Sequence, residues 1–125
     1  MTILLIALGG ALGSVARYLT VTGAARLFGA GFPYGTMIAN VLGSALMGLA
    51  VVLLIDRIGQ DAVRWAPGVT VGFLGGYTTF SAFTLDAYLM LEAGRFGAVI
   101  GYVAGSVLLS LLGLAIGITL GRVFG

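Results

Sequence analysis

Long apolar stretches separated by short polar segments dominate this chain of 125 residues. Four of the stretches reach roughly 20 residues, the length that a helix needs to cross the hydrocarbon layer of a membrane. They cover residues 2–22, 34–55, 66–91 and 97–121, and the connections between them are too short for a soluble domain. The pattern therefore predicts an all-α membrane protein with four transmembrane helices in a single domain, residues 1–125.

The third of these stretches contains a polar interruption, residues 75–83, with the sequence GGYTTFSAF. Backbone N–H and C=O groups left unpaired in lipid cost several kcal/mol each, so a break at this depth requires protein or water around it. Breaks of this kind usually surround ion or substrate sites. We therefore expect the third helix to be broken near its middle and to carry the functional site.

Composition supports the membrane assignment and excludes several functions. The chain is 60% hydrophobic and 8% charged, with a mean hydropathy of +1.17, whereas about a quarter of the residues in soluble domains are charged. It has no cysteine and no histidine, which removes disulfides, thiolate metal sites and the commonest general base. We expect no enzyme activity, and six singly spaced arginines indicate no nucleic-acid partner. The start of the chain lacks the positive charge of a signal peptide, so we expect it to be a retained span.

The arginines divide almost evenly between the two sides of the predicted bundle. The N-terminus, the 56–65 linker and the C-terminus share one side. That side holds Arg57, Arg64 and Arg122. The opposite side holds Arg26 and Arg95, and also Arg17 if its side chain extends to the interface. Since a bias in basic residues sets membrane orientation, this balance permits insertion in both orientations and pairing of inverted copies. The alternative is that features other than the arginines set one orientation of the chain in the membrane.

Small residues recur four positions apart, a spacing that places them on one helix face and allows close packing. They are Gly9/Gly13, Ser44/Gly48, Gly68/Gly72/Gly76, Gly101/Gly105 and Gly113/Gly117/Gly121. The pattern is compatible with packing inside one chain and with packing between copies, and both interpretations stay open.

Two polar stripes have the same four-residue spacing. The first stripe is Thr36, Asn40 and Ser44, and the second is Tyr102, Ser106 and Ser110. Such groups either form helix–helix hydrogen bonds or line a wet path, and three in register favour the path. Hydroxyls solvate ions of either sign, so the stripes alone do not decide selectivity.

Three further side chains are candidates for the site. Phe80 and Phe83 share a face of the helix after the break, and their positive ring edges can contact a poorly hydrated anion. Arg17 either extends to the interface or attracts anions to a vestibule. Asp86, the acid placed well inside a span, could accept hydrogen bonds or titrate in a proton-coupled transporter.

Three motifs in this order resemble the signatures of the Fluc (CrcB) fluoride channel family. They are GGALGSVARY at residues 9–18, GT with Asn40 and GS at 35–44, and GFLGGYTTFSAF at 72–83. The resemblance covers the whole four-span layout, and the third motif is the most specific. The chain departs from the common pattern at Ala39, Ala82 and Asp86.

The resemblance implies a passive, selective fluoride channel in the inner (plasma) membrane, built as an antiparallel, dual-topology homodimer with two pores in the lipid bilayer. Such channels release cytoplasmic fluoride that has entered as HF. The implied fluoride pathway comprises Phe80, Phe83, Asn40, Thr79, Ser81, Tyr102, Ser106, Ser110 and Arg17. The carbonyls of Gly75 and Thr78 would hold a structural Na⁺ at the dimer axis.

Two other hypotheses make different predictions. A small proton-coupled multidrug exporter shares the size and the four spans, but it needs a membrane-embedded acid, and residues 2–22 contain none. In this chain Asp86 would have to be that membrane-embedded acid. A non-transporting assembly subunit would tolerate replacement of Asn40 and the hydroxyl stripes.

Overall fold

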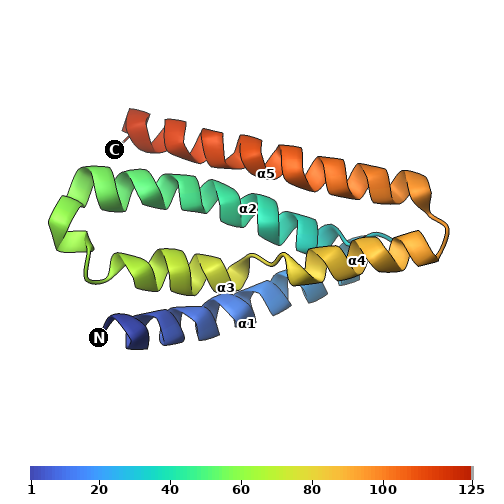
Figure 1. Cartoon of the computed structure of the whole chain (residues 1–125), viewed down its shortest axis with the longest axis horizontal. Helices are drawn as coiled ribbons and strands as arrows, with labels where there is room; N and C mark the ends of the chain where they lie inside the picture. Colours follow the sequence, from blue (N-terminus) through green and yellow to red (C-terminus); the bar gives the residue numbers. More distant parts are fainter. Residues whose placement is uncertain (125) are drawn as a thin grey trace.

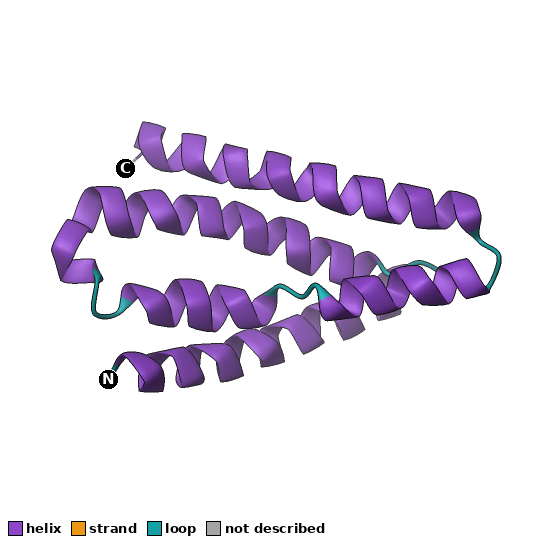
Figure 2. Cartoon of the chain, viewed as in Figure 1, coloured by secondary structure: helices purple, strands orange, loops and turns teal. Residues whose placement is uncertain are grey.

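The computed structural model describes residues 1–124, except for the side chains of residues 55–57 and 62. Arg57, which enters the charge count above, lies outside the described side chains. The described chain is helical almost throughout and contains no strand (Figure 2). The predicted all-α class is confirmed.

Eight helical segments follow one another along the described chain. They are α1 (Thr2–Phe28), α2 (Tyr34–Ala50), the π-helical η1 (Val51–Ile58), the 3₁₀ turn η2 (Gly59–Ala62), the π-helical η3 (Gly68–Leu74), α3 (Gly75–Tyr77), α4 (Ser81–Glu92) and α5 (Phe96–Phe124). Three stretches in the described residues are long and apolar enough to cross a membrane: Thr2–Phe28, Tyr34–Leu54 and Phe96–Phe124. Residues predicted as the 66–91 span form η3, α3 and α4 instead of one long helix.

Glycines and a proline set several of the helix ends. α1 runs past its predicted end at residue 22 and stops at Gly29, whose φ of 83° suits glycine and whose N–H donates to the Ala25 carbonyl at 2.9 Å. Pro33 precedes α2, and Gly94, with φ of 76°, separates α4 from α5. The Arg95 guanidinium donates to the Gly31 carbonyl, which joins the two turns at this end of the bundle.

Both termini lie at the end of the bundle opposite these turns (Figure 1). The η2 turn lies at the same end as the termini, as the charge count assumed. α2 and α5 run side by side in the same direction, and α1 packs against η3, α3 and α2. α4 packs against α5 at the end near the turns.

The glycines placed four apart create the close contacts inside this chain. A β-carbon at Gly13 would overlap the Phe73 carbonyl, where α1 crosses η3. A β-carbon at Gly48 or Gly117 would overlap a carbonyl of the facing helix, at Leu114 or Ala45. Most of the small-residue pattern therefore serves packing between helices of one copy.

We predict that Gly13→Ala destabilises the fold because the added methyl group meets fixed backbone instead of a movable side chain. Overpacking of this kind typically costs about 1–3 kcal/mol. The measurement is the free energy of unfolding in detergent micelles. Gly23→Ala is the matched control on the same helix, since no atom lies within 4 Å of its added β-carbon. Equal stability of the two variants would contradict the assigned contact.

Candidate functional site

The candidate site is built around residues 78–80, between α3 and α4. α3 ends at Tyr77, and the Thr78 N–H still donates to the Leu74 carbonyl at 3.0 Å, as in a helix. Thr78 itself is extended, with φ of −83° and ψ of 156°. Helical structure resumes at Ser81. The interruption between α3 and α4 therefore spans about one turn, residues 78–80, inside the polar run 75–83.

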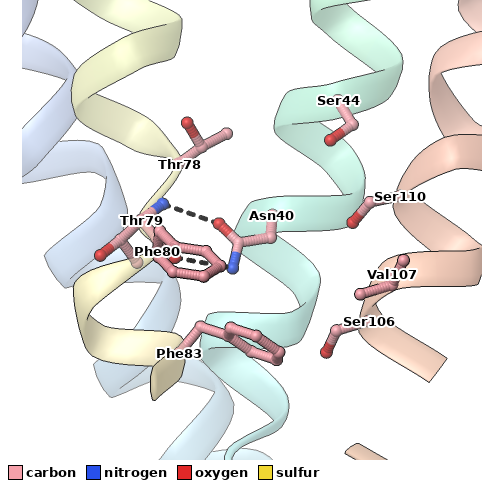
Figure 3. A pocket seen from close by; sticks show the side chains of 9 residues that line it. All are labelled: Asn40, Ser44, Thr78, Thr79, Phe80, Phe83, Ser106, Val107 and Ser110. Atoms are coloured by element: carbon pink, nitrogen blue, oxygen red, sulfur yellow. Dashed lines mark hydrogen bonds between the residues drawn. The ribbon is translucent and has the colours of Figure 1, made fainter. Parts of the chain in front are cut away.

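The side chain of Asn40, on α2, pairs with the backbone of Thr79 on both sides of its amide (Figure 3). The Thr79 N–H donates to Asn40 Oδ1 at 2.7 Å, and Asn40 Nδ2 donates to the Thr79 carbonyl at 3.0 Å. In a continuous helix the Thr79 N–H would donate to the Gly75 carbonyl. Asn40 thus replaces the helix as the partner of this peptide unit.

The hydroxyl of Thr79 supports the start of α4. Its Oγ1 accepts a hydrogen bond from the Ala82 N–H at 3.1 Å and lies 3.4 Å from Ser81 Oγ. The Ala82 N–H is one of the donors that a helix leaves unpaired at its first turn. In a continuous helix it would donate to the Thr78 carbonyl. Donors are therefore diverted from the carbonyls of both Gly75 and Thr78.

Tyr77 anchors the other side of the interruption to α1. The Thr20 hydroxyl donates its one hydrogen to the Ala16 carbonyl at 3.0 Å, so at 2.8 Å its oxygen accepts from the Tyr77 hydroxyl. The Tyr77 side chain is buried, and its ring stacks near Phe73 with centroids 6.3 Å apart. Asn40 and Tyr77 together fix the backbone on either side of Thr78.

A cavity of about 280 Å³ opens beside this backbone, between α2, α4 and α5. It brings together six residues of the predicted pathway: Asn40, Thr79, Phe80, Phe83, Ser106 and Ser110. Figure 3 shows them with the three other lining residues, Ser44, Thr78 and Val107. Val107 was not predicted, because an apolar residue in an apolar helix gives no signal in the sequence.

The remaining pathway candidates lie beside the cavity or apart from it. Tyr102 is fully buried behind Phe83, with ring centroids 5.1 Å apart, and its hydroxyl donates to Asp86 Oδ2 at 3.1 Å. Ser81 approaches Thr79 but does not line the cavity. Arg17 lies on α1, half-buried, and is not among the lining residues.

The two phenylalanines of the predicted aromatic pair differ greatly in exposure. Their ring centroids are 5.7 Å apart and the rings are tilted by 46°. Phe83 is 8% exposed, whereas Phe80 is 76% exposed. One ring thus belongs to the packed interior of this copy, and the other stands on its surface at the mouth of the cavity.

The serine hydroxyls in the cavity differ from the threonine hydroxyls, including that of Thr78 in the same lining, which donates to the Leu74 carbonyl at 2.9 Å. Thr70 and Thr119 donate to carbonyls four residues earlier, at 3.1 and 2.8 Å. Ser106 is 4% exposed, and its Oγ has no hydrogen-bond partner in the described structure. Ser44 and Ser110 likewise have no partner among the described residues. The cavity therefore presents free hydroxyl donors in apolar surroundings.

Comparison with known proteins identifies one family. Residues 4–118 match the family described as "CrcB-like protein, Camphor Resistance (CrcB)". The chain is 54% identical over 116 residues to a protein of Cereibacter sphaeroides named "Fluoride-specific ion channel FluC", covering 93% of this chain and 90% of the relative. Relatives with the same name in Paracoccus denitrificans and Caulobacter sp. strain K31 are 50% identical over 121 residues and 46% over 120, each covering 94% of the relative.

We predict that Asn40→Ala destabilises the interruption, because the Thr79 N–H and C=O lose both partners at once. Two hydrogen bonds at about 1 kcal/mol each give an expected loss near 2 kcal/mol in the free energy of unfolding. Hydrogen exchange of the Thr79 amide should also accelerate. Ser44→Ala is the matched control, since it removes a polar group one turn away that has no protein partner. An unchanged Thr79 exchange rate in Asn40→Ala would refute the pairing.

Proposed function

The chain belongs to the CrcB-like family, and on that basis we propose that it is a passive, fluoride-selective channel that exports cytoplasmic fluoride. It is a multi-pass membrane protein and not an enzyme. The observation that supports fluoride most directly is the set of unpartnered donors in the cavity. Ser106, Ser110 and Ser44 offer hydrogens to an acceptor, and the described residues of the cavity lining include no carboxylate. Fluoride is the strongest hydrogen-bond acceptor among the halides.

The aromatic rings extend the path that these donors begin. A phenylalanine ring is positive at its edge, so the tilted rings of Phe80 and Phe83 can contact an anion that has shed part of its hydration shell. The buried Tyr102 ring supports Phe83 from behind. In the proposed path, fluoride passes along the rings and then along the hydroxyls of α5, with Ser81 and Tyr102 close to the route. Arg17 would raise the local anion concentration at a vestibule.

The oligomeric part of the proposal is an antiparallel homodimer with two pores. We interpret η3, α3 and α4 as a fourth membrane span, broken at residues 78–80. Phe80 then stands 76% exposed beside a polar backbone turn, which lipid would cover poorly. A second copy of the chain would cover both the Phe80 ring and the polar backbone turn. The even division of arginines allows the two copies to insert in opposite orientations.

The backbone at the break also fits a structural sodium ion. Carbonyl oxygens are the ligands that hard cations prefer, and the carbonyls of Gly75 and Thr78 are those whose helical donors are diverted to Asn40 and Thr79. Gly75 is exposed, so its carbonyl can face a partner. A bound Na⁺ would supply positive charge that links the breaks of two copies. Asn40 and Thr79 hold the carbonyls free for it.

The multidrug-exporter alternative has no support in the site. Its chemistry requires a carboxylate free to exchange a proton for a cation, whereas Asp86 accepts a hydrogen bond from the Tyr102 hydroxyl between α4 and α5. Asp86 also lies outside the cavity that holds the free donors.

We predict that liposomes containing only this purified protein release fluoride rapidly down its gradient and release negligible chloride. A fluoride-selective electrode and a chloride electrode measure the two fluxes on the same preparation. Protein-free liposomes are the control. The channel proposal fails if reconstituted protein gives no fluoride flux above that control.

In the same assay, Phe83→Leu should slow the flux about tenfold, because leucine fills the space but has no ring edge, and a contact worth about 1.4 kcal/mol corresponds to a factor of ten. Phe96→Leu, a distant exposed ring at the start of α5, is the control. Equal rates in the two variants would exclude the Phe83 ring from the path.

We predict that the protein purified in sodium is dimeric by light scattering in detergent, and that replacing sodium by a large organic cation lowers the melting temperature of the dimer. The carbonyls of two breaks would then face one another without a cation between them. A monomeric protein in sodium would contradict the dimer. A dimer with the same melting temperature in both cations would contradict the sodium site alone.

A further inference from the structure

Ser44 lines the cavity from α2 but takes part in no hydrogen bond among the described residues. A serine in a helix usually has a ready partner in the carbonyl four residues earlier, which here belongs to Asn40. Thr70 and Thr119 use that option on their own helices. Ser44 is half-buried, and at that depth a hydroxyl without a protein partner is open to a ligand in the cavity. The free hydroxyl of Ser44 therefore indicates a ligand.

The hydroxyls around Ser44 converge from two helices. In Figure 3, Ser110 of α5 points toward α2, Ser44 lies on the neighbouring part of α2, and Ser106 lies one turn earlier on α5. Ser106 is 4% exposed and equally without a partner. The described lining of the cavity contains neither a carboxylate nor a basic side chain. These are neutral donors, and a small anion is the ligand that they fit.

Beyond Ser44 the backbones of α2 and α5 are in close contact. The next position on the same face of α2 is Gly48, where a β-carbon would overlap the Leu114 carbonyl of α5. On α5 the residue one turn after Ser110 is the apolar Leu114. Ser44 and Ser110 are thus the last polar groups before α2 and α5 close on each other.

We propose that Ser44 is a fluoride-binding residue that shares one anion site with Ser110 at the closed end of the cavity between α2 and α5. The inference rests on the proposed channel function and adds Ser44, a member of the first polar stripe, to the fluoride pathway that the family resemblance implies. In the free protein the two hydroxyls have no protein acceptor. A fluoride ion there accepts from both, so the site replaces part of the ion's hydration without a fixed charge. At this point the path must leave the space between α2 and α5.

The test compares fluoride efflux from liposomes containing the wild type or one variant. Removing one hydrogen bond to an anion costs about 1.5–3 kcal/mol, so Ser44→Ala should slow the flux about tenfold or more. Ser44→Thr keeps the hydroxyl and should restore most of the rate. Thr119→Ala is the matched control, because that hydroxyl is exposed on α5 and is paired within its own helix. The melting temperature of Ser44→Ala should equal that of the wild type, since no protein bond is lost.

A double variant tests whether the two serines share one site. If they do, Ser44→Ala combined with Ser110→Ala should slow the flux by less than the product of the single effects. If the two single effects on the flux multiply in the double variant, the serines act independently and the shared site is overturned. A wild-type rate in Ser44→Ala, or a slow Ser44→Thr, overturns the role of Ser44 while leaving the channel intact. If the wild-type protein gives no fluoride flux, the channel proposal itself is overturned, so the two failures are distinguishable.

Discussion

The two-sided pairing between the Asn40 side chain and the Thr79 peptide unit is the interaction on which the rest of the site depends. A backbone interruption in hydrocarbon is costly unless each freed N–H and C=O finds a partner. Asn40 supplies both partners at 2.7 and 3.0 Å. The same pairing diverts a donor from the Gly75 carbonyl and places Phe80 and Phe83 beside the cavity. One amide therefore links the break, the free carbonyls and the aromatic rings.

Close helix contacts give that pairing its fixed frame. Gly13 lets α1 approach the backbone of η3, and Gly48 and Gly117 bring α2 against α5. Asn40 and the cavity serines lie on these closely packed helices, so their positions relative to Thr79 are set by backbone contact. The bond between Tyr77 and Thr20 holds the other side of the break to α1. The break is thus irregular in conformation but held on both sides, which a selective site requires.

The sequence predicted much of this arrangement, because breaks, four-residue spacings and composition are local signals. The polar run at residues 75–83, the two polar stripes and the all-α class follow from these signals, whereas the helix of the structure is interrupted only at residues 78–80. The pairing of Asn40 with Thr79 joins residues 39 positions apart, and the Tyr77–Thr20 bond joins residues 57 apart, so neither is encoded in spacing. Sequence reasoning assigned Asn40 to the anion path; the structure places it in the cavity lining and shows that it also pairs with the Thr79 backbone. Sequence reasoning placed Ser44 in a polar stripe that favours a wet path, although the pathway implied by the family resemblance does not include this residue.

In the proposed channel, the absence of charge from the described cavity lining would allow the site to conduct its ion instead of retaining it. An arginine or a bound metal among the donors would hold a fluoride ion tightly, and conduction requires binding strong enough to replace hydration but weak enough to release the ion. Hydroxyl dipoles and ring edges meet this requirement, since each contributes a modest attraction and several act in succession. Arg17 lies outside the cavity lining, where a positive charge can attract anions without binding them inside the path. The separation of charge from neutral donors thus favours passive flow over storage or coupled transport.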